Sequence, residues 1–166
     1  MNNPQTHHEY SAENTRPFCH SGSHSGSNAA EDSSVDKNGD AFIGTVLIVD
    51  DEASNSEPLE AILTDSGYRV YTAANGLDGL ERMDLVTPEL VILDFMMPLM
   101  NGAEMGRRLR ANPATQNIPI VMNSGTSEDM VRQNFTGYDA FLRKPYKIDE
   151  LLSVVRNLLE SSADKR

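Results

Sequence analysis

From about residue 45 onward, short apolar runs alternate with longer stretches whose apolar residues recur every three or four positions. Continuous runs are typical of parallel strands covered on both faces, and the longer recurrence is typical of amphipathic helices. The runs predict strands at 45–50, 69–73, 90–94, 118–122 and 139–143. The other stretches predict helices at about 56–66, from Asn75-Gly76 onward, and at about 102–111, 128–135 and 148–159. This alternation predicts an α/β fold of five βα units, with a parallel sheet and helices on both faces.

Three of the predicted strands end in charged residues. The first runs into Asp50-Asp51, the third into Asp94 and the fifth into Lys144. Because the carboxyl ends of parallel strands meet at one edge of the sheet, these side chains should share a single crevice. Several carboxylates and one ammonium are costly to bring together without a cation. The pattern therefore predicts a charged functional site at this edge.

The residue types at this edge fit phosphoryl transfer. A carboxylate such as Asp94 can attack phosphorus and form an acyl phosphate. Catalysis of that step depends mostly on positioning and on neutralisation of charge, which a divalent cation and Lys144 would supply. The hydroxyl of Ser124, at the end of the fourth strand, could donate a hydrogen bond to a transferred oxygen.

A magnesium ion fits the same residues. Mg²⁺ prefers an octahedron of oxygen ligands and usually keeps several waters. Asp51 and Asp94 could each supply one oxygen, a backbone carbonyl near Met96 a third, and Asp50 could act through water. The sequence thus predicts a Mg²⁺ (or Mn²⁺) site built from acidic side chains and one carbonyl.

The order and spacing of these motifs resemble the receiver domain of two-component response regulators. The acidic pair is followed by the stretch DFMMPLMNG at 94–102, by Ser124 and by Lys144-Pro145. Asp94 lies 43 residues after Asp51, 30 before Ser124 and 50 before Lys144, as in the family. The resemblance covers residues 45 to about 160. It implies a flavodoxin-like, doubly wound (βα)5 fold with strand order 2-1-3-4-5.

By this resemblance Asp94 is the phosphoacceptor, Asp50 and Asp51 are metal-site acids, and Lys144 is the family's pocket ammonium. The phosphodonor would be a sensor histidine kinase or a His-containing phosphotransfer protein. The chain would not be an enzyme in the usual sense, but a phosphoacceptor with Mg²⁺-dependent self-phosphorylation and autodephosphorylation.

The resemblance also implies a switch. Ser124 takes the place of the switch hydroxyl and Phe141 that of the switch aromatic, with a cis peptide expected before Pro145. In the family the hydroxyl moves toward the phosphoryl group and the aromatic turns inward, which remodels the face of the fourth helix, fifth strand and fifth helix. The expected output is contact with a downstream protein that the sequence does not name, with a phosphorylation-dependent homodimer as a further option.

Composition limits the other partners. The net charge of −11 disfavours binding to nucleic-acid phosphates or anionic lipid, so we expect no direct contact with either. No apolar stretch approaches the roughly 20 residues that span a bilayer. The single cysteine, Cys19, rules out an internal disulfide and favours a reducing compartment. We expect a soluble, cytoplasmic protein.

The chain divides unevenly. Residues 1–44 are rich in Ser, Asn, Gly and His, which predicts a disordered low-complexity tail because such a segment buries too little surface to order itself. Residues 45–161 are the predicted receiver domain, and 162–166 form a short C-terminal tail.

Three alternative functions compete with this interpretation. A nucleotide- or flavin-binding enzyme on the same fold is disfavoured because the loop after the first strand is acidic and would repel phosphate. A phosphohydrolase that resembles the Asp-x-Asp-x-Thr class is disfavoured because Met96 stands where that class has its second aspartate. The third alternative keeps the receiver domain but makes it the N-terminal part of a longer regulator with an output domain, or a phosphorelay intermediate. As given, the chain is expected to act as a stand-alone receiver.

Overall fold

The computed structural model describes residue 39 and residues 41–163. Most of the predicted N-terminal tail, and the last three residues of the predicted C-terminal tail, lie outside the described residues. Backbone pairing with the domain begins slightly before the first strand. The amide of Ile43 donates to the carbonyl of Gly67 (3.0 Å), and the carbonyl of Gly44 accepts from Arg69 (2.9 Å).

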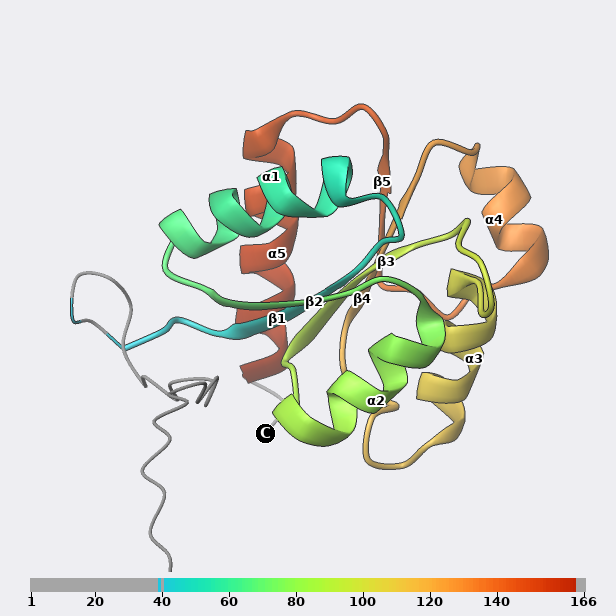
Figure 1. The fold of residues 1–166 in the computed structure, drawn as a ribbon, viewed down its shortest axis with the longest axis horizontal. Helices are drawn as coiled ribbons and strands as arrows, with labels where there is room; N and C mark the ends of the chain where they lie inside the picture. Colours follow the sequence, from blue (N-terminus) through green and yellow to red (C-terminus); the bar gives the residue numbers. More distant parts are fainter. Residues whose placement is uncertain (1–38, 40, 164–166) are drawn as a thin grey trace, which may run out of the picture. The chain divides into compact units, whose positions relative to one another are not determined.

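The described residues form one five-stranded parallel sheet in the order β2-β1-β3-β4-β5 (Figure 1). The fold predicted from the resemblance is therefore confirmed. The strands are β1 (Thr45–Val49), β2 (Arg69–Ala73), β3 (Leu90–Asp94), β4 (Ile120–Ser124) and β5 (Ala140–Arg143). The helices are α1 (Ala53–Asp65), α2 (Gly76–Val86), α3 (Gly102–Ala111), α4 (Glu128–Asn134) and α5 (Ile148–Ala163).

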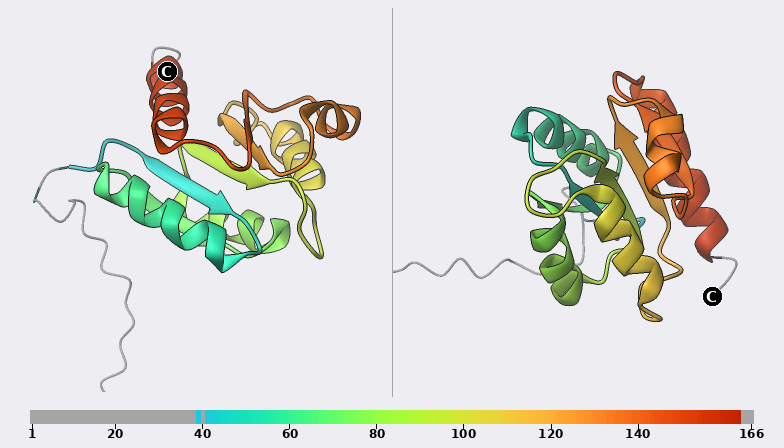
Figure 2. Two further views of the ribbon diagram at one scale, coloured as in Figure 1. Left: turned by 90° about the horizontal axis from the view of Figure 1, so that it is seen from above. Right: turned by 90° about the vertical axis from the view of Figure 1, so that its right-hand side faces the viewer.

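The sheet is covered on both faces, as continuous apolar strands require (Figure 2). Alternate strand residues point to opposite faces. Val46 and Ile48 contribute to the layer that includes the apolar residues of α1 and α5. Leu47 and Val49 contribute to the layer formed with α2, α3 and α4. Among the described residues, no helix is both long and apolar enough to cross a membrane.

Helix α1 begins earlier than predicted. The sequence places its start at about residue 56 so that Pro58 falls in the first turn, but the helix begins at Ala53 and contains Pro58 in its second turn. The earlier start follows a local hydrogen bond: a side-chain oxygen of Asp50 accepts the amide of Glu52, two residues further on, at 2.9 Å. The predicted start was therefore wrong by about three residues.

Strand β4 is shifted by two residues from the predicted 118–122 to Ile120–Ser124. The amide of Ile118 is used in a turn, where it donates to the carbonyl of Thr115 (3.0 Å), and Pro119 has no amide to donate. The ladder therefore starts only at Ile120. The shift places Asn123 and Ser124 within the strand, and both side chains are buried.

Candidate functional site

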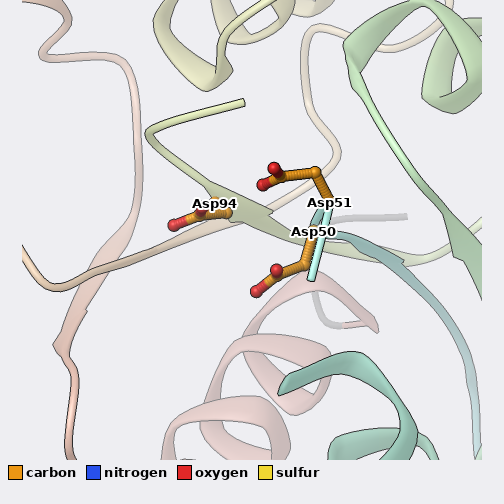
Figure 3. A group of neighbouring side chains, drawn as sticks. All are labelled: Asp50, Asp51 and Asp94. Atoms are coloured by element: carbon orange, nitrogen blue, oxygen red, sulfur yellow. The ribbon is translucent and has the colours of Figure 1, made fainter. Parts of the chain in front are cut away.

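Three carboxylates meet at the carboxyl ends of β1 and β3 (Figure 3). Asp50 and Asp51 follow β1, and Asp94 is the last residue of β3. Each offers an oxygen that lies within 4.8 Å of the other two. Asp50 and Asp94 are buried, whereas Asp51 is exposed at the mouth of the pocket. A compact set of hard oxygen donors of this kind fits Mg²⁺ by its chemistry.

The ammonium of Lys144 lies between the two buried carboxylates. Its Nζ is 2.7 Å from Oδ2 of Asp50 and 3.4 Å from Oδ1 of Asp94. Its backbone amide donates to the carbonyl of Ser124 at 2.8 Å, which joins the start of the β5–α5 loop to the end of β4. The structure thus brings together the charged residues of all three strand ends. Asp50 is the nearer partner of the ammonium, which the sequence did not indicate.

Burial and charge both act on these groups. Burial raises the pKa of Asp94 to about 6, although the Lys144 ammonium lowers it and the Asp50 carboxylate raises it further. Burial opposes the charge of Lys144, but its hydrogen bond to Asp50 and the charges of Asp94 and Asp50 outweigh that effect, so the pKa of Lys144 is raised. The pocket therefore holds the ammonium charged and leaves Asp94 less acidic than an ordinary aspartate.

The loop between β3 and α3 folds back over the end of β3. The amide of Gly102 donates to the carbonyl of Phe95 (3.1 Å). A side chain at Gly102 would collide with the carbonyl of Asp94, so only glycine allows this approach. Met96, the predicted carbonyl ligand, lies in this loop with its side chain exposed. Leu99 is also exposed there, with a φ of 65°.

The hydroxyl of Ser124 faces its own loop. Its oxygen accepts the amide of Thr126 at 3.1 Å, and the side chain is buried. Phe141 is half-buried and contacts the core layer of α2, α3 and α4. Its ring lies 6.2 Å from that of Tyr138. The peptide bond between Lys144 and Pro145 is cis, as the resemblance implied.

Helix α4 is attached differently at its two ends. At its start, a carboxylate oxygen of Glu128 accepts the hydroxyl of Tyr138 (3.1 Å) and the guanidinium of Arg132 (2.7 Å). At its end, Phe135 fills a space lined by Gly106 and Gly137, where an added methyl would lie 2.6 and 2.7 Å from its ring. The end is thus held by close packing and the start by polar contacts near Phe141.

Sequence reasoning missed two polar contacts at the site. Asn55 of α1 donates from Nδ2 to Oδ1 of Asp50, at a long 3.4 Å. Asn123, beside Asp94 in the sheet, donates from Nδ2 to the phenol oxygen of Tyr146 at 3.3 Å. The second contact had a signal in the sequence, because the polar Asn123 directly follows the apolar residues 120–122 of β4.

Comparison with known proteins agrees with this geometry. The family model described as response regulator receiver domain matches residues 46–156. The chain is 40% identical over 118 residues to the response regulator Rre1 of Synechocystis sp., an alignment that covers 69% of this chain and 51% of Rre1. It is 36% identical over 120 residues to the response regulator ArlR of Staphylococcus aureus, covering 72% and 54% of the two chains.

Two solved structures are also similar. A signal receiver domain of a histidine kinase from Syntrophus aciditrophicus is 35% identical, with a TM-score of 0.67 over 71% of this chain and 91% of that one. The receiver domain of the sensor histidine kinase PA1611 from Pseudomonas aeruginosa is 25% identical, with a TM-score of 0.66 over 70% and 98%. The latter carries a magnesium ion coordinated in its active-site cleft.

The chain spans about half the length of the curated relatives it matches. The matched segment, in contrast, covers most of the described residues and includes each strand-end charge of the pocket. On this match the chain belongs to the family of response regulator receiver domains, the signalling domains of two-component systems.

Proposed function

We propose that Asp94 accepts a phosphoryl group from a phosphohistidine of a sensor histidine kinase or a His-containing phosphotransfer protein. The observation that carries this proposal is the pocket itself. The buried carboxylate of Asp94 shares it with two further carboxylates, each offering an oxygen within 4.8 Å, and with an ammonium at 3.4 Å. A carboxylate placed beside charge-neutralising groups is suited to attack phosphorus.

In this reaction a carboxylate oxygen of Asp94 forms a bond to phosphorus while the phosphorus–nitrogen bond of the donor breaks, and the imidazole leaves. Asp94 must be ionised to attack. Lys144, already within 3.4 Å of the carboxylate, would neutralise an oxygen of the incoming group. The chain therefore contributes the nucleophile and one positive charge without large rearrangement.

Asp50, Asp51, Asp94 and the backbone carbonyl of Met96 are the proposed holders of Mg²⁺ (or Mn²⁺). When bound, the cation would neutralise the charge that develops on the transferred oxygens. The donor set supports this assignment, and the magnesium ion in the PA1611 receiver domain is a precedent in a relative. The same pocket would support self-phosphorylation from small donors and autodephosphorylation.

The proposed output runs through Ser124 and Phe141. The Ser124 oxygen accepts the amide of Thr126, and its hydroxyl proton could be donated to a phosphoryl oxygen. A turn of the Ser124 side chain toward that oxygen would draw it away from the amide of Thr126. The β4–α4 loop would then shift the start of α4, where a carboxylate oxygen of Glu128 accepts the hydroxyl of Tyr138. Phe141, next to Tyr138, would turn inward and change the face of α4, β5 and α5. A target protein, or a second copy of the chain, would bind that altered face in the cytoplasm.

The length comparison favours a second candidate. Because the chain matches only about half of Rre1 and ArlR, the receiver domain would be the N-terminal part of a longer regulator with an output domain, or an intermediate of a phosphorelay. In either case, the proposed receiver domain is 45–161, with 1–44 and 162–166 as the proposed tails. The backbone pairing of Ile43 and Gly44 and the end of α5 at Ala163 lie just outside these bounds. The mass of the native protein would distinguish a stand-alone receiver domain from part of a longer regulator.

Incubation with Mg²⁺ and acetyl phosphate tests the function. We expect one acid-stable, base-labile phosphoryl group, seen by intact-protein mass spectrometry, and no labelling of Asp94→Asn. Asp84→Asn, at an exposed position of α2, is the matched control and should be labelled like the original chain. Labelling of Asp94→Asn at the same level would refute the assignment.

A further inference from the structure

Strand β4 carries a buried amide beside the phosphoacceptor. Asn123 is 2% exposed, and the register of the sheet pairs its Cα with that of Asp94. Residues paired across neighbouring strands project to the same face, so the amide lies next to the carboxylate. Its Nδ2 donates to the phenol oxygen of Tyr146, while Oδ1 is buried and has no hydrogen-bond partner among the residues that the structure describes.

A buried amide that is only half satisfied costs free energy. An apolar side chain of similar shape would fill the space without that cost, as at Val121, the preceding residue of β4 on this face. Departures of this kind from ordinary core composition tend to occur at functional sites. The amide of Asn123 therefore calls for a role beyond the filling of the core.

Two hydrogen bonds join β4 to the segment that carries the pocket ammonium. The first links the amide of Lys144 to the carbonyl of Ser124 (2.8 Å). The second links the side chains of Tyr146 and Asn123 (3.3 Å). The two bonds lie on either side of Pro145 and end on consecutive residues of β4. Together they attach the Lys144 segment to β4 at both ends.

The phenol of Tyr146 lies close enough to the pocket to experience its charges. Burial raises the pKa of this phenol; its hydrogen bond with Asn123 and the charge of Lys144 lower it, and Asp50 and Asp94 raise it. Tyr146 is therefore near enough to Lys144, Asp50 and Asp94 for their charges to act on its phenol.

We propose that Asn123 and Tyr146 are a positioning pair, which holds the segment of Lys144 so that its ammonium lies against Asp50 and Asp94. The pair acts through Lys144 and does not itself touch the transferred group. This inference rests on the proposed function only for its kinetic consequence, because the placement of the ammonium can be measured in the resting protein.

The test uses the full chain with Tyr146→Phe, Asn123→Leu and the double variant. Tyr146→Phe removes only a hydroxyl, and Asn123→Leu replaces the amide by an apolar group of similar shape. Tyr68→Phe is the matched control, since it removes a hydroxyl from a buried tyrosine just before β2, at the opposite edge of the sheet. The readouts are the NMR order parameter of the Lys144 ε-methylene, the rate of phosphorylation by acetyl phosphate with Mg²⁺, and the melting temperature.

We expect both single variants to lower the order parameter and to reduce the phosphorylation rate about fivefold, the equivalent of one lost neutral hydrogen bond. The double variant should be no slower than the singles, because the same contact is lost in each. Asn123→Leu should melt at the same or a higher temperature, so that a loss of rate cannot be a loss of fold. Tyr68→Phe should leave the order parameter and the rate unchanged.

An unchanged order parameter in both Tyr146→Phe and Asn123→Leu would overturn the inference, as would an equal loss in Tyr68→Phe. If the original chain takes up no phosphoryl group but the variants still loosen Lys144, the proposed function fails and the positioning role stands. If the chain is phosphorylated and the variants neither loosen Lys144 nor slow the reaction, the function stands and the positioning role fails.

Discussion

Replacement of Asp94 by asparagine is expected to stabilise the fold at neutral pH. The pKa of this carboxyl is raised from 3.8 to about 6, chiefly because burial disfavours its ionised form. A carboxyl with a raised pKa contributes stability when protonated, and that contribution is lost as the pH rises through the folded-state value. Between about pH 4 and pH 6 the original chain should therefore lose stability as the pH increases. The uncharged amide of the Asp94→Asn variant would carry no such penalty.

The size of the effect follows from the same shift. A difference between 3.8 and about 6 corresponds to roughly 3 kcal/mol at 1.36 kcal/mol per tenfold change in the proton affinity. The pocket opens to solvent at Asp51, and screening by water reduces this value, so we expect about 1–2 kcal/mol at pH 7. Lys144 keeps its closer partner, Asp50, at 2.7 Å, so the substitution does not leave the ammonium without an ion pair.

Urea unfolding at pH 7 and at pH 4, in buffer with a chelator, measures the difference. Asp94→Asn should be more stable than the original chain by about 1–2 kcal/mol at pH 7, and the gain should nearly vanish at pH 4. Asp84→Asn, exposed on α2, should show neither change. Added Mg²⁺ should stabilise the original chain and narrow the gap, because a cation that binds only the folded state adds stability by mass action.

An Asp94→Asn variant that is equally or less stable at pH 7 would show that ionised Asp94 does not destabilise the fold. A gain of the same size at both pH values would likewise contradict the prediction, because such a gain would come from packing or hydrogen bonding rather than from ionisation.

Three further predictions concern the pocket, the attachment of α4 and the tail. The rate of phosphorylation by acetyl phosphate at low Mg²⁺ should fall from pH 7 to pH 5 in stopped-flow measurements, by up to about tenfold, because Asp94 must be ionised to attack and its pKa in the metal-free pocket is raised to about 6. A higher Mg²⁺ concentration should reduce the fall, since a bound cation favours the carboxylate; a flat profile at every Mg²⁺ concentration would contradict this. Gly106→Ala should destabilise the domain by about 1–3 kcal/mol in urea, since the added methyl would lie 2.6 Å from the ring of Phe135, whereas Gly125→Ala, with no atom within 4 Å, should cost little. Deletion of residues 1–40 should leave cooperative unfolding and phosphorylation intact by calorimetry and mass spectrometry, and loss of either would show that the tail supports the domain.

Much of the fold could be predicted because the strands are buried on both faces. A continuous apolar run such as 90–93 is typical of a buried parallel strand, and the structure has β3 at Leu90–Asp94. The boundaries were less predictable. The start of α1 depends on a carboxylate oxygen of Asp50 that accepts the amide of Glu52, and the start of β4 depends on a turn that uses the amide of Ile118. Both contacts are local, over two and three residues, but they are specific turn hydrogen bonds that the pattern of apolar residues does not reveal.

The candidate site, like the fold, could be predicted only in part. The sequence could predict which charged residues share the crevice, because parallel strands end at one edge of the sheet and each charged residue lies at such an end. The sequence could not predict which charged group forms an ion pair with which. That Lys144 lies 2.7 Å from Asp50 and 3.4 Å from Asp94 depends on the path of the β5–α5 loop. Contacts such as Glu128–Tyr138, ten residues apart, depend likewise on how α4 packs on the domain.

The sequence alone thus determined that this protein has a sheet edge bearing acids and an ammonium, because periodicity and strand ends are local properties of the chain. Only the tertiary structure decided which of these groups touch, how deeply Asp94 is buried, and that Asn123 bonds to Tyr146 beside it. The physical reason is that hydrogen bonds and burial join residues far apart in the chain. Their geometry exists only after the apolar layers on both faces of the sheet have fixed the positions of the strand ends.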